Sequence, residues 1–253
     1  MKNITLIESM NKFGHMNSNK NFYPEGVSSS EIKKIFLERR MALGEKFGFD
    51  GHKMFMADQV HQRGTYFEIT QDYVEANPDG WSDIPEDILL ITDKVPGVVI
   101  GHSVADCPVV IMADRKQGVM GVCHCSAALI DKRMPMMLAD ALVDAYSSCD
   151  EDIDVYVGAC AGDSWTYDKY PSWATDTKMW QEGIYYGDDG LFHIDMRKVL
   201  SNQFRERNID SNRIVYNMDD TITNPNYYSN SLALKFPKKK GRHFTGAVYK
   251  KTR

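Results

Sequence analysis

Residues 102–125, HSVADCPVVIMADRKQGVMGVCHC, contain two apolar runs separated by a polar turn. The first run begins at Cys107 and ends at Asp114, and the second begins at Gly118 and ends at His124. Both runs have the length and the Val, Ile and Met content of buried strands. We therefore predict two strands that carry a thiol and an imidazole at matching edges. Packing alone requires neither group.

The surrounding sequence predicts a mixed α/β chain. Further strand-like runs lie at residues 53–61, 65–70, 87–93, 97–104 and 153–160. Ser28 and Glu31 form a capping-box pattern before a helical apolar repeat that ends at Gly48. A second helical pattern covers residues 128–149 despite Pro135, and a third begins at Asp195, a candidate N-cap. Residues 11–27 are polar and predict an irregular lead-in.

The composition indicates an ordinary globular protein. With 43% hydrophobic residues the 253-residue chain can build a sizeable core, and we expect a single domain over residues 1–253. A net charge of −5 opposes nucleic-acid binding, which needs an excess of Lys and Arg. The five cysteines form no regular framework and no apolar run is long enough for a membrane span. We expect reduced thiols and a cytoplasmic location, with no membrane partner.

Three strand-end residues suggest a metal site. His61, Cys107 and His124 each lie where a predicted strand meets a loop. Two imidazoles and one thiolate suit Zn²⁺, and catalytic zinc sites keep three protein ligands and one open position. The alternative is that Cys107 is a small buried apolar residue and that both histidines bond to backbone. The spacing of the three residues does not decide between these interpretations.

Several motifs follow one another in order from about Gly26 to the C-terminus, namely ADQVHQ, DILLITD, HSVADCPVVIMAD, GVCHC, VGACAGDSWTYD, FHID and KGRHFTGA. Their order resembles that of the laccase-domain family, also called YfiH-type or multicopper polyphenol oxidase-like. The members of that family are regarded as zinc-dependent purine nucleoside phosphorylases. The resemblance implies an α+β fold, a four-layer α/β/β/α sandwich with mixed sheets. It also implies that His61, Cys107 and His124 are both the metal ligands and the catalytic residues.

The chain departs from the family pattern at two places. The metal histidine is usually followed by Ala-Gly-Trp-Arg-Gly, whereas this chain has Ala127 and Ala128 where Trp and Arg are usual. The late aromatic pair and serine are present, but NSL replaces the arginines that usually follow them. If those arginines hold phosphate, another donor must replace them. The candidates are Arg39, Arg40 and Arg242.

The sequence leaves three functional hypotheses. The first is a zinc enzyme that acts on adenosine, inosine and related nucleosides by phosphorolysis, deamination or both, with purine nucleosides and phosphate as its small-molecule partners. The second is a copper-dependent polyphenol oxidase, although seven histidines are few for several coppers. The third is a non-catalytic nucleoside-binding paralogue. The oligomeric state is left open.

Residues beside the candidate ligands have simpler predicted roles. Cys123 and Cys125 flank His124, and strand alternation makes them packing residues. Asp106 adjoins Cys107 and is a candidate for orienting a metal ligand, or alternatively a turn carboxylate. His102 is not predicted to be a ligand, since a fourth protein ligand would close the site.

Overall fold

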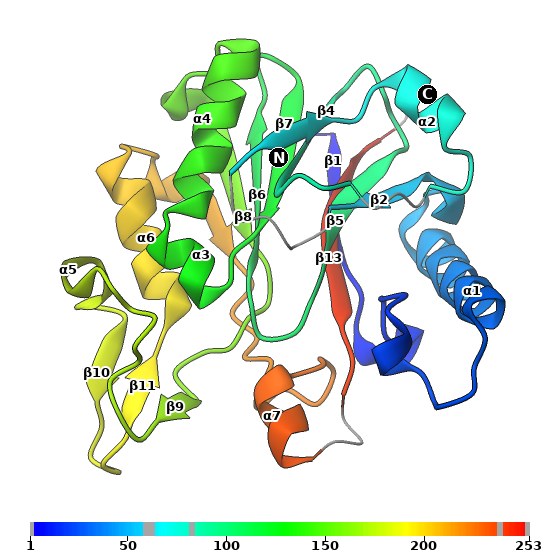
Figure 1. Ribbon diagram of the computed structural model, residues 1–253. Helices are drawn as coiled ribbons and strands as arrows, with labels where there is room; N and C mark the ends of the chain where they lie inside the picture. Colours follow the sequence, from blue (N-terminus) through cyan, green and yellow to red (C-terminus); the bar gives the residue numbers. More distant parts are fainter. Residues whose placement is uncertain (1–2, 58–63, 81–83, 237–239, 251–253) are drawn as a thin grey trace.

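The fold is built on two mixed sheets that pack face to face. The computed structural model describes residues 3–57, 64–80, 84–236 and 240–250 (Figure 1). The strand order is β1-β13-β5-β2 in one sheet and β12-β8-β6-β7-β4-β3 in the other, and each sheet combines parallel and antiparallel pairs. The strands are β1 Ile4–Glu8, β2 Met54–Met56, β3 Tyr66–Glu68, β4 Ile88–Thr92, β5 Val99–Val104, β6 Val109–Asp114, β7 Val119–His124, β8 Ile153–Val157, β12 Ile214–Tyr216 and β13 His243–Tyr249.

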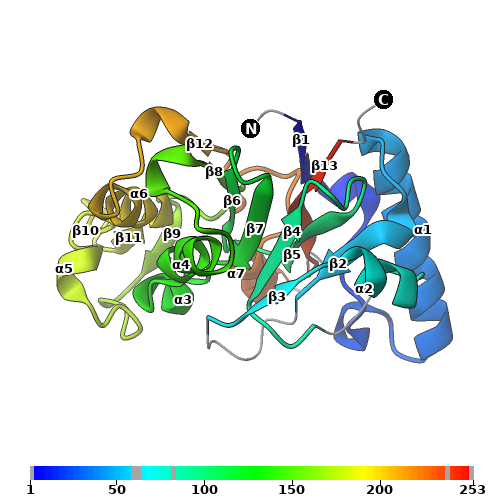
Figure 2. The same cartoon turned by 90° about the horizontal axis from the view of Figure 1, so that it is seen from above.

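Helices cover the outer faces of both sheets (Figures 1 and 2). The helix α1 lies against the four-stranded sheet, and α3, α4 and α6 lie against the six-stranded sheet. The helices are α1 Ser29–Phe47, α2 Gln71–Ala76, α3 Ala127–Asp131, α4 Met134–Tyr146, α5 Thr177–Trp180, α6 Met196–Glu206 and α7 Asn230–Lys235. Short 3-10 helices lie at Asn11–Phe13, Lys20–Phe22, Gly51–Lys53, Asp150–Asp152 and Ser211–Arg213.

The apolar residues form three cores because alternate side chains of each strand point to opposite faces. In β6, Val110 and Met112 pack toward α4 and α6, and we call this core the helix-side core. Val109 and Ile111 pack between the two sheets, in the inter-sheet layer. The third core joins Phe36 of α1 to Phe244 of β13. Helices, sheet, sheet and helix therefore form the predicted four-layer sandwich.

Local sequence signals set the ends of two helices as predicted. Ser28 and Glu31 form both halves of a capping box at α1, and Gly48 ends that helix in the left-handed conformation with φ 79°. The Asp195 carboxylate accepts a hydrogen bond from the Arg197 backbone N–H at 3.0 Å and caps α6. These ends rely on neighbouring residues alone, so the sequence is enough to predict them.

The helix predicted over residues 128–149 is instead two helices. The first, α3, ends at Asp131, and α4 begins at Met134. Arg133, between them, has a left-handed φ of 64°, and Pro135 lies in the first turn of α4. Proline fits a first turn because its missing N–H would have no helical partner there. The single-helix prediction was wrong because Pro135 starts a new helix.

A separate three-stranded sheet was not predicted. Its order is β10-β11-β9, with bounds Ile184–Tyr186, Phe192–Ile194 and Trp165–Tyr167. Each strand has only three residues, which is too short for a readable alternation. The sheet lies beside α5 and α6 (Figure 1). It packs on the helix-side core through Ile184, Ile194 and Trp165.

The centre of the four-stranded sheet depends on two facing glycines. Gly101 of β5 pairs with Gly246 of β13, and a Cβ on Gly101 would lie 2.4 Å from both the Thr245 carbonyl oxygen and the Phe244 ring. We expect Gly101→Ala to lower the free energy of unfolding by about 1–3 kcal/mol, measured by urea denaturation. Gly121→Ala is the comparison, because within 3 Å its Cβ would meet only side-chain methyl groups, those of Leu90 and Leu138, and no backbone atom. Equal losses in both variants would contradict this account.

Candidate metal centre

The structure brings two of the predicted ligands to the same end of the inter-sheet layer. His124, the last residue of β7, pairs with Val109, the first residue of β6, and Cys107 lies just before β6. Val109 and Val122 face the inter-sheet core, so alternation turns His124 toward that layer. His61, the third predicted ligand, lies outside the described residues.

Two further histidines lie at this end and were not predicted as site residues. The His102 and His124 rings have centroids 6.2 Å apart. His102 belongs to β5 and His243 to β13, and they are 1% and 0% exposed. Among the described residues, the ring nitrogens of these two histidines have only weak backbone contacts, with Val122 for His102 and with Tyr228 and Ala159 for His243. Buried imidazole groups usually form stronger hydrogen bonds.

Burial determines the protonation states of these groups. It lowers the pKa of His102 and His243 to about 4 and that of His124 to about 3, where the charges of His102 and Arg242 add to the lowering. All three imidazoles are neutral at pH 7 and keep a lone pair for a ligand. Burial and the Asp106 carboxylate raise the pKa of Cys107 to about 12. A metal that binds Cys107 must therefore displace its proton.

Asp106 fixes the backbone that presents Cys107. It adopts a left-handed φ of 74°, and its carboxylate accepts hydrogen bonds from the Thr221 hydroxyl and the Ser231 N–H, both at 2.7 Å. Its carbonyl accepts from the Ala161 N–H at 2.7 Å. The loops that hold Ala161 and Thr221, and the first turn of α7, are thus tied to the backbone beside the thiol. These bonds are compatible with both predicted roles of Asp106, as an orienting group and as a turn carboxylate.

A second carboxylate acts on His124. Asp87, immediately before β4, accepts a hydrogen bond from the Gly64 N–H at 2.9 Å and raises the pKa of His124 against the stronger effect of burial. Carboxylates beside metal-binding imidazoles commonly orient them. Asp87 was not predicted as a site residue, although it is the first residue of the predicted strand over residues 87–93.

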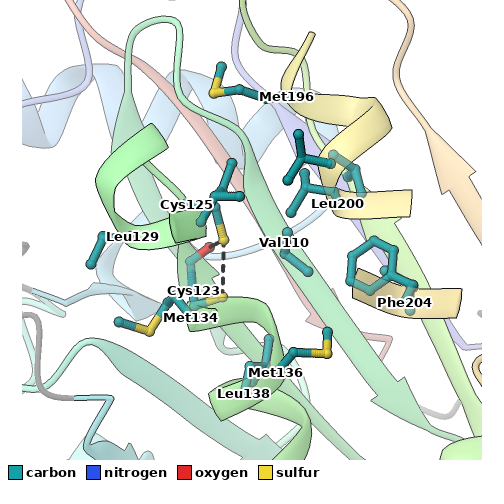
Figure 3. Close-up of a cluster of buried hydrophobic side chains, with 14 of the residues drawn as sticks. Val110, Cys123, Cys125, Leu129, Met134, Met136, Leu138, Met196, Leu200 and Phe204 are labelled. Carbon is teal, nitrogen blue, oxygen red and sulfur yellow. Dashed lines mark hydrogen bonds between the residues drawn. The ribbon is translucent and has the colours of Figure 1, made fainter. Parts of the chain in front are cut away.

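The cysteines that flank His124 face the helix-side core, as the alternation predicted. Figure 3 shows Cys123 and Cys125 among Leu129, Met134 and Leu200, with the two sulfur atoms 3.5 Å apart. Both side chains are fully buried, and burial raises the pKa of Cys125 well above its usual value. These thiols fill space between β7 and the helices.

A partly buried carboxylate network borders the same end of the layer. The Glu8 carboxylate accepts hydrogen bonds from the Tyr156 hydroxyl, the Ala159 N–H, the Asn217 side-chain amide and the Tyr227 hydroxyl at 2.6–3.0 Å. The Tyr227 ring lies edge-on to His243 with centroids 5.1 Å apart. Glu8 comes from β1, whereas Tyr156 comes from β8, so the network joins the two sheets.

The donor set fits a borderline-soft metal such as zinc. Cys107 offers a thiol, and the buried Nδ1 of His124 has no hydrogen-bond partner among the described residues. Within the described parts of the chain, no three His, Cys, Asp or Glu residues form a ready cluster of metal ligands. The described pair would therefore need a further donor, and His61 remains the predicted one.

The three candidate phosphate donors differ in their surroundings. The Arg40 guanidinium is buried over the Phe36 ring and donates to the Asp79 carbonyl, so it serves the packing of α1. Arg242 acts electrostatically on Cys107, Asp106 and His124. Arg39 lies over Tyr23 and donates to the His15 carbonyl at 2.8 Å. Arg242 is thus the candidate that the structure brings to the predicted ligands.

Comparisons with known proteins agree with this architecture. The chain shares its fold with the crystal structures of the hypothetical protein YfiH from Bacillus licheniformis (15% identity, 98% of this chain and 93% of that one, TM-score 0.76) and of YlmD from Geobacillus stearothermophilus (14%, 99% and 93%, 0.79). Neisseria meningitidis protein NMB0706 is also similar (10%, 99% and 96%, 0.72).

The family model described as "Multi-copper polyphenol oxidoreductase laccase" matches residues 17–249. The chain therefore belongs to this laccase-like, YfiH-type family, whose description implies metal binding. A search of curated proteins finds no match. Among the described residues, no helix combines the length and apolar character needed to cross a membrane.

Proposed function

We propose that this protein is a zinc-dependent enzyme that acts on purine nucleosides, by phosphorolysis, by deamination of adenosine, or by both. The observation that carries the proposal is the placement of Cys107 and His124 at one end of the inter-sheet layer, beside neutral buried imidazoles. Zinc would be held by these residues together with His61. Bound zinc supplies a Lewis acid that polarises oxygen and lowers the pKa of water.

The described residues suit a small polar substrate. Cys107 and His124 hold the ligand atoms, Asp106 and Asp87 fix their surroundings, and Arg242 places positive charge beside them. Phosphorolysis would convert nucleoside and phosphate into free purine and ribose 1-phosphate, whereas deamination would convert adenosine and water into inosine and ammonia. The net charge of −5 supports small solutes rather than nucleic acid as partners, and the free cysteines support a reducing, cytoplasmic location.

A copper-dependent oxidase is the second candidate, favoured by the family description. The small number of histidines in the chain counts against a copper-dependent oxidase. The chain has seven histidines, of which His15 contacts Phe22 and Tyr23, and His193 bonds to Asp189 and the Asp163 carbonyl. A multicopper centre needs more imidazoles than remain near Cys107. A non-catalytic nucleoside-binding protein is the third candidate, motivated by Ala127 and Ala128.

Adenosine incubated with the zinc-loaded protein, with and without phosphate, distinguishes these candidates. We expect adenine and ribose 1-phosphate only when phosphate is present, or inosine under both conditions, as measured by chromatography. Cys107→Ala is the control and should give neither product. Unchanged adenosine would overturn the enzymatic proposal, and oxidation of a simple phenol by copper-loaded protein would favour the oxidase.

A further inference from the structure

Three cationic side chains lie over two neighbouring aromatic rings. The Arg242 guanidinium carbon is 4.8 Å from the centroid of the Phe22 ring, and the Lys240 ammonium is 5.2 Å from the same ring. The Arg39 guanidinium carbon is 5.6 Å from the Tyr23 ring centroid. We name Arg39, Lys240 and Arg242 the cationic group. It gathers like charges in a protein whose net charge is negative.

Backbone contacts hold this group in place. The Met16 N–H donates to the Arg242 carbonyl at 2.8 Å, and the Arg39 side chain donates to the His15 carbonyl at 2.8 Å. A Cβ on Gly241 would lie 2.2 Å from the Tyr228 ring, so this ring packs directly on the backbone next to Arg242. The predicted lead-in over residues 11–27 therefore packs against α1 and the start of β13.

Among the described residues, the two arginines of this group form no ion pair with a carboxylate. Other described arginines form ion pairs with Asp or Glu, namely Arg115, Arg133, Arg205, Arg207 and Arg213. Within the described residues, no carboxylate oxygen lies within 4.0 Å of Arg39 or Arg242. Asp106 attracts Arg242 electrostatically without forming an ion pair with it. The positive charge beside the candidate metal centre is therefore left for another anion.

The Arg242 guanidinium, held over the Phe22 ring, presents several N–H donors for a planar, bidentate contact. One edge group of Arg242 donates to the Gly241 carbonyl at 2.9 Å. The remaining donors match the oxygen geometry of a phosphate group, which a guanidinium binds with two parallel hydrogen bonds.

We propose that Arg242, assisted by Lys240 and Arg39, binds a phosphate group at the edge of the candidate metal centre. The group is either inorganic phosphate or the phosphate of a purine nucleotide. What this phosphate does chemically rests on the proposed function, whereas the binding site rests on the cationic group itself. If the arginines absent at residues 127–128 and 230–232 hold phosphate in the family, Arg242 takes over that task here.

Calorimetric titration of the metal-free, full-length protein tests the proposal without turnover. Inorganic phosphate and adenosine 5′-monophosphate are the two probes. We expect Arg242→Gln to weaken binding of at least one probe by about tenfold or more, since hydrogen bonds to charged groups contribute that much. Arg242→Lys should restore binding only in part because it lacks the bidentate fork.

Arg205→Gln is the matched control, since it removes the same charge from an exposed ion pair and should leave both affinities unchanged. Thermal unfolding of each variant confirms that it is folded. If wild-type protein binds neither probe, or if Arg242→Gln binds both as tightly as wild type, the proposal is overturned. Phosphate binding that depends on Arg242, without any nucleoside turnover, would overturn the proposed function alone.

Discussion

Replacing Cys107 with alanine is expected to weaken zinc binding by at least about a hundredfold. Loss of a group that only orients a ligand already costs 10–100-fold in metal affinity, and Cys107 is predicted to bind the metal itself. The thiol lies beside His124 at the end of the inter-sheet layer, and no other described cysteine is placed to replace it. Cys123, Cys125 and Cys160 belong to the helix-side core, and Cys149 is exposed.

Competition with a chelating dye measures this affinity directly. Cys123→Ala is the matched control, because it removes a thiol only one residue from His124 yet on the opposite face of β7. A cobalt-loaded sample gives an independent readout, since a thiolate-to-cobalt absorption band should be present in wild type and in Cys123→Ala and absent in Cys107→Ala. Wild-type zinc affinity in Cys107→Ala would refute the predicted site. His124→Ala should weaken zinc binding similarly while the protein remains folded.

Replacing Glu8 with leucine is expected to lower the free energy of unfolding by about 2–4 kcal/mol. The carboxylate accepts hydrogen bonds from four donors, and each buried donor that loses its partner costs about 1–3 kcal/mol. The total is less than the sum because the Tyr227 hydroxyl also lies 3.2 Å from the Asp219 carboxylate and can donate there instead. Urea denaturation at neutral pH measures the loss.

Two variants separate hydrogen bonding from charge at this position. Burial raises the pKa of Glu8, so the folded state holds its proton more readily than the unfolded state does. Protonated Glu8 therefore adds to the free energy of unfolding at low pH, and this contribution is lost as pH rises through the pKa of Glu8 in the folded state. Glu8→Gln, an uncharged analogue of the protonated form, should therefore lose less stability than Glu8→Leu. Exposed Glu25→Leu should be nearly neutral, and an equally small loss in Glu8→Leu would contradict this role.

Local residues were enough to predict many elements and part of the site. Helix ends at Ser28, Gly48 and Asp195 depend on hydrogen bonds within a few residues, so their sequence patterns are informative. The placement of Cys107 near His124 also follows from a short hairpin, in which β6 and β7 are joined by four residues. Because side chains alternate along β7, the His124 side chain lies on the opposite face from those of Cys123 and Cys125.

Only the tertiary structure revealed the rest of the site. His102 and His243 come from β5 and β13, and Arg242 reaches Cys107 from far along the chain. Glu8 meets Tyr156 and Asn217 across 148 and 209 residues. No local pattern specifies such partners, because strand register and sheet packing are decided by the burial of whole apolar faces. The sequence by itself determined the elements and the hairpin that joins Cys107 to His124, whereas packing of the two sheets decided which distant charges and imidazoles surround that pair.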